Sequence, residues 1–484
     1  MHVESVDSVV NPGHQFEWWT PRLAWPVIAA AVVRLTVMAV ALEKMGTSTL
    51  THADTCSYLI PGRNLLLHGQ FMADGVPDLL RSPGYPLFLA ITSLAGLPAA
   101  ALVNVILSVF SVVLVWKLGR AVFDDDRIAL GAAWIFAFEP GSVTASSTLI
   151  SETLFLVLYL LSMERLAEFL RGRRLPALAA AGLWLAAATF VRPVTYYLPV
   201  FLALGLFIVL ARVPGLRWKA PAVLLICVMP WLAAWQIRNR VETGYSGFSS
   251  ISDENLYFLA AADVTARVEH RFPRDVSQQL GYGDFTGNSG QSYLFQPYLA
   301  LHPEQTKWNQ AQRLAYLHSE AVRIIRAHYG IYLRSCLIDL LKTVSYPSTY
   351  ELSRLKYSGS PTYGSHTYAA VIADEGLGAW RIILARAQVH PWVIAENAVF
   401  GPLLVVLYLF TVRGFYFVTR GVFRGGIHSA CLWLLLGMSL YCLVVSMAAT
   451  GALPSTRMRL PVMPVICILA AAGFLRAKTM TIAT

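Results

Sequence analysis

The chain has 484 residues, of which 56% are hydrophobic and only 14% are charged, and its formal net charge is +10. Soluble proteins carry about 25% charged residues, so this composition and the mean hydropathy of +0.54 exclude an ordinary soluble protein and indicate a polytopic membrane protein. The positive charge does not indicate a nucleic-acid partner, because the Lys and Arg residues cluster in short loops between apolar segments.

The first apolar segment is expected to remain as a membrane anchor. The chain begins with a polar, acidic stretch and lacks the basic n-region and adjoining apolar core of a cleaved signal peptide. A spanning helix needs about 20 mostly apolar residues. By that length the sequence predicts about ten spans, in a range of roughly 10–12, at 26–43, 98–116, 128–146, 149–163, 175–191, 194–211, 220–237, 392–412, 428–449 and 460–475.

The loop charges predict how these helices are oriented. Basic residues cluster within 117–127, 165–174, 212–219, 413–424 and 476–478. The positive-inside rule places these loops in the cytoplasm, together with both termini. The loops 44–97, 238–390 and 450–459 then face outward. No internal repeat is visible, which weighs against the transporters that are built from repeats.

We therefore expect an all-α membrane protein in three parts. Residues 1–237 would form a catalytic transmembrane module with a first outer loop at 44–97, residues 238–390 a small extracytoplasmic domain, and residues 391–484 the C-terminal transmembrane helices. The apolar stretch 84–97 is too short to span and is expected to lie in the interface. Apolar residues spaced by three or four predict an amphipathic helix over 304–328, and a second helix is expected near 330–346.

A polar cluster follows the first apolar segment, from His52 to Pro86. Asp54 and Tyr58 are four residues apart, so on a helix they share a face. A carboxylate at the membrane boundary can act as a general base. The alternative is that Asp54 caps a helix or is a solvated loop residue. Both interpretations are open from the residues alone.

A second acid, Glu152, begins an apolar segment on the same predicted side. It could pair with Asp54, bind a metal with Asp54 and His52, or hold an acceptor. The alternative is stabilisation of a helix N-terminus, with Ser151 as the cap. Glu139 is a weaker candidate for the second acid. No metal-binding signature such as HExxH is present, so a divalent metal remains an open question.

Arginines recur at the outer boundary, where the positive-inside rule expects few. They are Arg63, Arg81, Arg192, Arg238, Arg240, Arg457 and Arg459. Arg binds phosphate bidentately and keeps its charge, so this set suits a lipid phosphate; contact with lipid head groups or neighbouring acids is the alternative. Arg34 lies in the middle of the first span and is either a functional charge or part of an ion pair, for instance with Glu139.

The six cysteines show no CxxC spacing. Only Cys56 and Cys336 are placed to face an oxidising compartment, and a disulfide between them is left open by the spacing. The sequence also has no P-loop, no GxGxxG and no cytoplasmic DxD motif, which disfavours a nucleotide-dependent reaction inside the cell.

Several motifs occur in an order that resembles one family. They are Asp54 with Tyr58 and NLLLHGQF, then RSPGYPLFLA (81–90), SETLF (151–155), VRP (191–193), PWLAAWQIRN (230–239) and RMRLPVMP (457–464). The order resembles that of bacterial GT-C glycosyltransferases that use polyprenyl-phosphate sugars, a group related to the protein O-mannosyltransferase and lipid A aminoarabinose transferase families. The resemblance implies a GT-C-like helical bundle.

The resemblance also implies roles for single residues. Asp54 would be the catalytic base and Glu152 a second acid in the cavity. Arg81, Arg238, Arg457 and Arg459 would hold the lipid phosphate, with Tyr58, Arg63, Tyr85, Arg192 and His52 as further candidates. Many members have an acid directly after the catalytic Asp, whereas this chain has Thr55, which puts metal use by such a pair in doubt.

The function that follows is inverting sugar transfer from a polyprenyl phosphate to a protein, glycan or lipid acceptor. It would take place at the periplasmic face of a bacterial inner membrane. One alternative is an oligosaccharide polymerase or ligase that uses polyprenyl-pyrophosphate substrates. Another is a transporter or flippase of lipid-linked sugars. The sugar and the acceptor are left open.

Overall fold

Helices of very different lengths make up almost the whole structure. The computed structural model describes residues 19–52, 54–282, 296–346, 380–381, 391–422, 427–450 and 456–482. Within these residues the only strands form one short antiparallel hairpin, β1 (Met72–Ala73) and β2 (Val76–Pro77). The prediction of an all-α membrane protein is confirmed.

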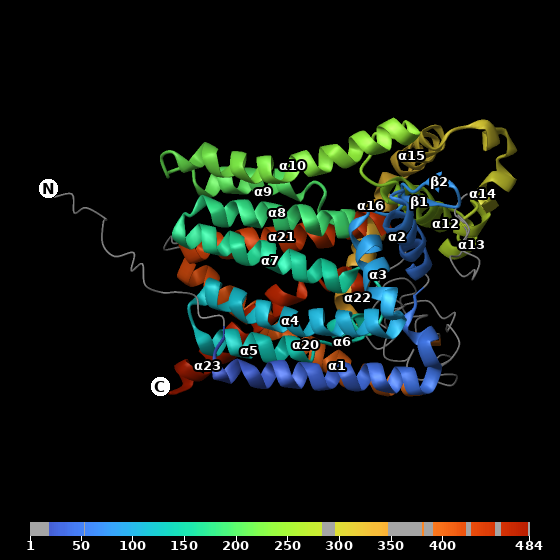
Figure 1. Cartoon of the computed structure of the whole chain (residues 1–484). Coiled ribbons are helices and arrows are strands. Elements are labelled where there is room, and N and C mark those ends of the chain that lie inside the picture. The colour runs from blue at the N-terminus through green and yellow to red at the C-terminus, as the bar shows by residue number, and fades with distance from the viewer. Residues whose placement is uncertain are drawn as a thin grey trace.

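Long apolar helices form a bundle (Figure 1). In the described part of the chain, five helices are long and apolar enough to cross a membrane. They are α1 (Ala24–Met45), α4 (Leu97–Phe123), α10 (Leu216–Thr243), α20 (Pro391–Val422) and α21 (Ile427–Thr450). A sixth span is made if α5 (Asp126–Ala137) and α6 (Pro140–Ser146), which meet at a bend of 57°, count as one.

The expected count of about ten spans is therefore not confirmed. The remaining candidates are shorter or more polar helices in the same bundle (Figure 1). They are α7 (Glu152–Gly172), α8 (Leu175–Val191), α9 (Leu198–Val209) and α23 (Met463–Ile482). The chain is a multi-pass membrane protein.

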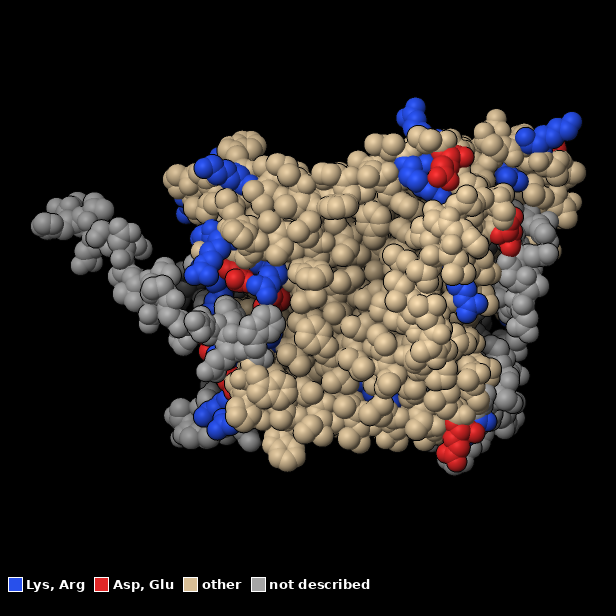
Figure 2. Space-filling view, in the orientation of Figure 1, with Lys and Arg blue, Asp and Glu red and all other residues tan. Residues whose placement is uncertain are grey.

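Charge is distributed as a membrane requires. In Figure 2 the Lys, Arg, Asp and Glu side chains gather at the two ends of the bundle, and the band between them is almost free of charge. Helix α1 begins and α23 ends at the same end of the bundle (Figure 1). An N-in, C-in topology requires this arrangement.

The opposite end carries the short helices of the predicted outer segments (Figure 1). From the first outer loop come α2 (Thr55–His68), the β-hairpin and α3 (Gly84–Thr92). From the long segment come α11 (Ile251–Asn255), a π-helical turn (Leu256–Ala261), α12 (Ala262–Val268), α13 (Pro273–Gln279), α14 (Gln296–Leu301), α15 (Gln310–Ala327) and α16 (Tyr329–Ser345). The four-residue helix α22 (Thr456–Arg459) lies beside them.

The amphipathic helix expected at 304–328 is confirmed as α15. It begins later than expected, because Asn309 and Gln312 form a reciprocal capping box that fixes the first turn at Gln310. Its buried face consists of Leu314, Leu317, Ala321 and Ile325. The helix expected near 330–346 is confirmed as α16.

Arg34, the charge in the middle of α1, is fully buried and supports the break between α5 and α6. It donates hydrogen bonds to the Ala137 carbonyl (2.8 Å) and to the hydroxyls of Ser108 (2.7 Å) and Ser142 (2.9 Å). The Ala137 carbonyl lies at the end of α5, where no helical donor remains for it. Within the described residues, the ion-pair partner of Glu139 is Arg459, at 3.9 Å, and not Arg34.

The disulfide left open by the sequence is not formed. Cys56 and Cys336 are both free thiols.

Gly62 allows α2 and α3 to pack closely, and it gives the first prediction. A Cβ at Gly62 would overlap the Pro86 carbonyl oxygen, so Gly62→Ala forces the two helices apart. We expect the free energy of unfolding to fall by about 1–3 kcal/mol, measured as a lower midpoint of thermal unfolding in detergent. The matched control is Gly330→Ala in α16, where a Cβ meets nothing within 4 Å. Equal midpoints for the two variants would contradict the predicted contact.

Candidate active site

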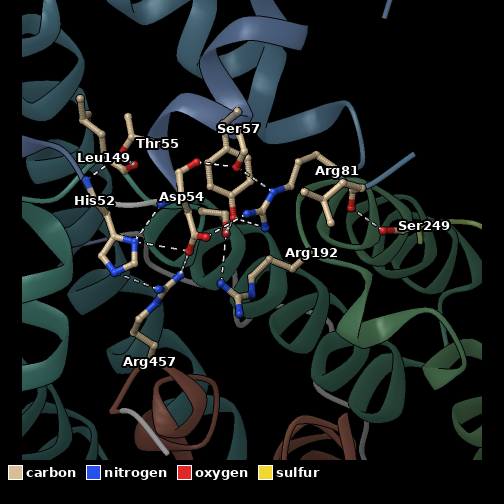
Figure 3. Close-up of polar contacts among 12 residues, drawn as sticks. His52, Asp54, Thr55, Ser57, Arg81, Leu149, Arg192, Ser249 and Arg457 are labelled. Carbon is tan, nitrogen blue, oxygen red and sulfur yellow. Dashed lines mark hydrogen bonds and ion pairs between the residues drawn. The ribbon is translucent and has the colours of Figure 1, made fainter. Parts of the chain in front are cut away.

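Asp54 lies one residue before α2 with its carboxylate between two arginines (Figure 3). Its Oδ1 accepts a hydrogen bond from Arg81 Nη2 at 2.9 Å, and its Oδ2 accepts one from Arg457 Nη2 at 3.1 Å. Asp54 occupies the N-cap position of α2, but its side chain makes no capping hydrogen bond and binds the arginines instead. One fifth of the side chain is exposed (20%).

The first turn of α2 holds Arg81 in place. Arg81 donates from Nε to Ser57 Oγ at 3.0 Å and from Nη1 to the Tyr58 hydroxyl at 3.2 Å, and its guanidinium lies 4.3 Å from the centre of the Tyr58 ring. Asp54 and Tyr58 therefore share a face and a partner, as their spacing predicted. Tyr85 is buried and packs edge-on against Tyr58, with ring centres 4.8 Å apart.

Glu152, the first residue of α7, joins the same cluster. Its Oε1 lies 2.5 Å from Arg457 Nε and 2.5 Å from Arg192 Nη1, and the residue is only 2% exposed. Ser151 makes no capping hydrogen bond; its hydroxyl instead accepts one from Arg192 at 3.0 Å. Arg457 thus bridges Asp54 and Glu152, the two acids that the sequence proposed as partners.

His52 and Thr55 complete the turn around Asp54 (Figure 3). His52 Nδ1 accepts the backbone N–H of Asp54 at 3.1 Å, and its Nε2 lies 3.4 Å from Arg457 Nη1. The Thr55 hydroxyl is buried; it donates to the Leu149 carbonyl (3.0 Å) and accepts from the backbone N–H of His52 (2.8 Å). In the described part of the chain, no three His, Cys, Asp or Glu residues form a group that could hold a metal ion.

Three arginines of the cluster share its acids. Arg192 and Arg457 contact Glu152, Arg81 and Arg457 contact Asp54, and Arg81 also interacts with the nearby Asp78 carboxyl. Burial opposes ionisation of the Asp54 carboxyl, but Arg81, His52 and Arg457 outweigh burial and hold its pKa well below the usual range. Asp54 is therefore ionised at neutral pH.

A pocket adjoins this cluster and is lined by both charged and apolar side chains. Its charged lining residues are Glu152, Arg192 and Arg457. Its apolar walls include Phe155 and Leu156 of α7, Val194, and Leu460 and Pro461 after α22. The lining thus places two guanidinium groups beside apolar side chains.

Two of the arginines expected to hold phosphate lie elsewhere. Arg238 donates to the backbone carbonyls of Phe71 (2.8 Å) and Asp78 (3.2 Å) and so braces the first outer loop. Arg459 is buried against the end of α16, where it donates to the carbonyls of Val344 and Tyr346. Arg63 is exposed on α2.

The sequence did not single out Ser57 and Glu254. Ser57 could have been found from its position three residues after Asp54 on the face of α2. Glu254 carried no sequence signal. Its Oε1 accepts a hydrogen bond from Ser250 Oγ at 2.6 Å, next to the backbone bond from Ser250 N–H to the Leu79 carbonyl at 2.8 Å. The long outer segment thereby holds the residues that precede Arg81.

Comparison with known proteins supports the motif assignment. Residues 82–235 match the family model described as dolichyl-phosphate-mannose-protein mannosyltransferase. The matched segment contains Glu152 and Arg192, whereas Asp54, Arg81 and Arg457 lie outside it. The predicted resemblance to GT-C glycosyltransferases that use polyprenyl-phosphate sugars is confirmed. Among curated protein sequences, none matches the chain.

Two solved structures are similar over most of the chain. The oligosaccharyltransferase AglB from Archaeoglobus fulgidus, in complex with an inhibitory peptide and a dolichol-phosphate, has 13% identity and a TM-score of 0.46, covering 94% of this chain and 50% of its own. ArnT from Cupriavidus metallidurans, bound to undecaprenyl phosphate, has 15% identity and a TM-score of 0.38, covering 94% of this chain and 78% of its own. The chain thus spans about half the length of the archaeal oligosaccharyltransferase.

The buried acid Glu254 predicts how stability depends on pH. Burial raises its pKa to about 8 from the ordinary 4.5, although the Ser250 hydroxyl opposes this shift. Between these two pH values, Glu254 of the folded protein keeps a proton that the same residue has lost in the unfolded chain. We expect the thermal midpoint to fall as pH rises between about 4.5 and 8 and to level off above that range.

Glu254→Gln should flatten this slope. The slope is measured as the change of the thermal midpoint with pH, in detergent. The matched control is Glu269→Gln, which alters an exposed glutamate. An unchanged slope in Glu254→Gln would show that other groups cause the dependence.

Proposed function

We propose that the chain is an inverting glycosyltransferase that moves a sugar from a polyprenyl-phosphate donor to an acceptor hydroxyl. The reaction would take place at the outer, periplasmic face of a bacterial inner membrane. One observation carries the proposal: Asp54, a partly exposed carboxylate, shares Arg457 with a pocket that is lined by Arg192, Arg457 and apolar side chains.

The pocket suggests how the donor is held. Its phosphate would lie against the guanidinium groups of Arg192 and Arg457, which form charge-assisted and bidentate hydrogen bonds with phosphate oxygens. The polyprenyl chain would follow the walls near Phe155, Leu156 and Leu460 toward the lipid. A lipid phosphate is a leaving group that is already present in the bilayer, so the reaction needs no nucleotide.

The proposed reaction is a single displacement. The acceptor oxygen attacks the anomeric carbon while its proton passes to the Asp54 carboxylate. The bond between the anomeric carbon and the phosphate oxygen breaks, and its electron pair goes to the phosphate. The negative charge of the phosphate group thereby rises from one to two. Arg192 and Arg457 stabilise the charge that develops on the leaving group. Attack from the opposite side inverts the anomeric configuration.

The arginines also set the strength of the base. With Arg81 and Arg457 against it, Asp54 has a low pKa and takes up protons weakly. A phosphate that draws Arg457 toward itself removes one of these counter-charges and raises the pKa of Asp54. Donor binding would therefore make Asp54 a better base at the moment when the acceptor arrives.

The acceptor would be a protein, glycan or lipid hydroxyl that docks from the side of the long outer segment. This segment contacts the loop that leads to Arg81 through Ser249 Oγ, which donates to the Leu80 carbonyl at 2.7 Å, and through Gln310, which donates to the Pro77 carbonyl at 3.2 Å.

Asp54→Asn tests the proposed base. The variant keeps the size of the side chain but cannot take the acceptor proton, so we expect transfer to fall by about 10²–10⁴-fold. The assay uses purified protein with polyprenyl-monophosphate and polyprenyl-pyrophosphate sugars and reads lipid-phosphate release and product. Asp275→Asn, on exposed α13, is the matched control. Wild-type rates in Asp54→Asn would overturn the role of Asp54, and transfer from pyrophosphate donors alone would favour a polymerase or ligase.

Arg192→Gln tests the donor site. Loss of a charged hydrogen bond costs about 1.5–3 kcal/mol, so we expect the KM for the donor to rise by roughly 10–100-fold while the KM for the acceptor stays the same. Arg240→Gln removes an exposed arginine of the outer boundary and should leave both constants unchanged. If Arg192→Gln raises only the KM for the acceptor, the donor phosphate does not lie at Arg192.

A further inference from the structure

Helix α22 has only four residues and carries both Arg457 and Arg459. Residues two apart on a helix point in nearly opposite directions, because each residue turns the chain by about 100°. Arg457 points to Asp54 and Glu152, and Arg459 points away from them to α16. The sequence suggested one role for the two arginines, and the contacts give them different ones.

Arg459 closes the carboxyl end of α16. Its Nη1 lies 3.0 Å from the Val344 carbonyl oxygen and 2.8 Å from that of Tyr346. The last carbonyls of a helix lack helical donors, and a cation at this end is favoured by the helix dipole. The Tyr408 hydroxyl on α20 donates to the same Val344 carbonyl at 2.7 Å, so three helices meet at this point.

Arg459 also reaches the base of the broken span. Its Nη2 lies 3.9 Å from Glu139 Oε1, and the Glu139 side chain caps α6 by accepting the backbone N–H of Ser142. Arg459 is only 2% exposed and does not line the pocket beside Arg457. Its contacts are with the protein and fix the position of α22 between α16, α20 and α6.

We propose that Arg459 is a positioning residue for the transfer reaction, which anchors α22 so that Arg457 lies between Asp54 and Glu152. This role rests on the proposed function, because it requires that Arg457 acts in the active site. The contacts of Arg459 with α16, α20 and Glu139 set the direction in which α22 presents Arg457, and without them Arg457 loses its alignment with both carboxylates. Arg459 thus acts on the reaction through Arg457 and does not itself touch the donor.

A double-mutant cycle tests this coupling. We expect Arg457→Gln to lower kcat/KM by about 100-fold and Arg459→Gln by about 10-fold. Because residues that act through one another are not additive, the double variant should be no slower than Arg457→Gln alone. Arg413→Gln, at an exposed arginine on α20, is the matched control and should combine with Arg457→Gln without coupling. Arg459→Lys keeps the charge in a shorter side chain and provides a milder variant that should show the same coupling if Arg459→Gln does not fold.

The pH profile of kcat/KM provides a second test, because a general loss of stability would not shift it. The groups that face Asp54 are Arg81, Arg457, His52, Tyr58 and Glu152. Removal or displacement of Arg457 raises the pKa of Asp54, so the acidic limb should move to higher pH in Arg457→Gln and in Arg459→Gln, and no further in the double variant.

The outcomes separate two failures. If the wild-type protein transfers no sugar from polyprenyl-phosphate donors, the proposed function fails. If the wild-type protein is active but the losses add and the acidic limb of Arg459→Gln stays in place, the positioning role of Arg459 is overturned while the proposed function stands.

Discussion

Arg457 lies between two buried or half-buried carboxylates, and the architecture of the site depends on that contact. A carboxylate removed from water is costly unless it is paired and hydrogen-bonded. Glu152 is almost fully buried, and its charge is balanced by Arg457 and Arg192 on one oxygen. The start of α2, the start of α7 and the short helix α22 must therefore meet at one point, although Asp54 and Arg457 are 403 residues apart in the sequence.

The second arginine at Asp54 is held from the other direction. Arg81 follows a stretch of backbone whose carbonyl groups accept hydrogen bonds from four residues, Ser249, Ser250, Gln310 and Arg238. The long outer segment and the end of α10 therefore fix one side of the carboxylate, while α16, through Arg459 and α22, fixes the other. The part of the chain proposed to receive the acceptor therefore contacts both the backbone that leads to Arg81 and the helix that carries Arg457.

The sequence predicted those features that depend on local pattern. The three-or-four spacing of apolar residues predicted α15, and the four-residue spacing of Asp54 and Tyr58 predicted a shared face. The number of spans was not confirmed, because α7 carries Glu164, Arg165 and Glu168 within its length and helices such as α8 and α9 are shorter than the length of about 20 residues that a span needs. The roles of the arginines could not be derived either. All four lie at the predicted outer boundary, but Arg238 and Arg459 donate to backbone carbonyls. Arg81 and Arg457 instead bind the Asp54 carboxylate. Glu254 directly follows Asp253 in a polar stretch, and only the folded chain shows that Glu254 is the buried one.

Thr55 shows how the charges of the site are arranged. Its hydroxyl donates to the Leu149 carbonyl and accepts from the backbone of His52 in a space that is 2% exposed. A carboxylate at this position could not donate to that carbonyl, and its charge would lie buried next to a carbonyl oxygen without a counter-charge. The hydroxyl instead joins the start of α2 to the residues that precede α7, and this brings Asp54 and Glu152 close enough to share Arg457. The guanidinium supplies the positive charge between the two acids, and its distance from Asp54 then determines how strongly the carboxylate holds a proton.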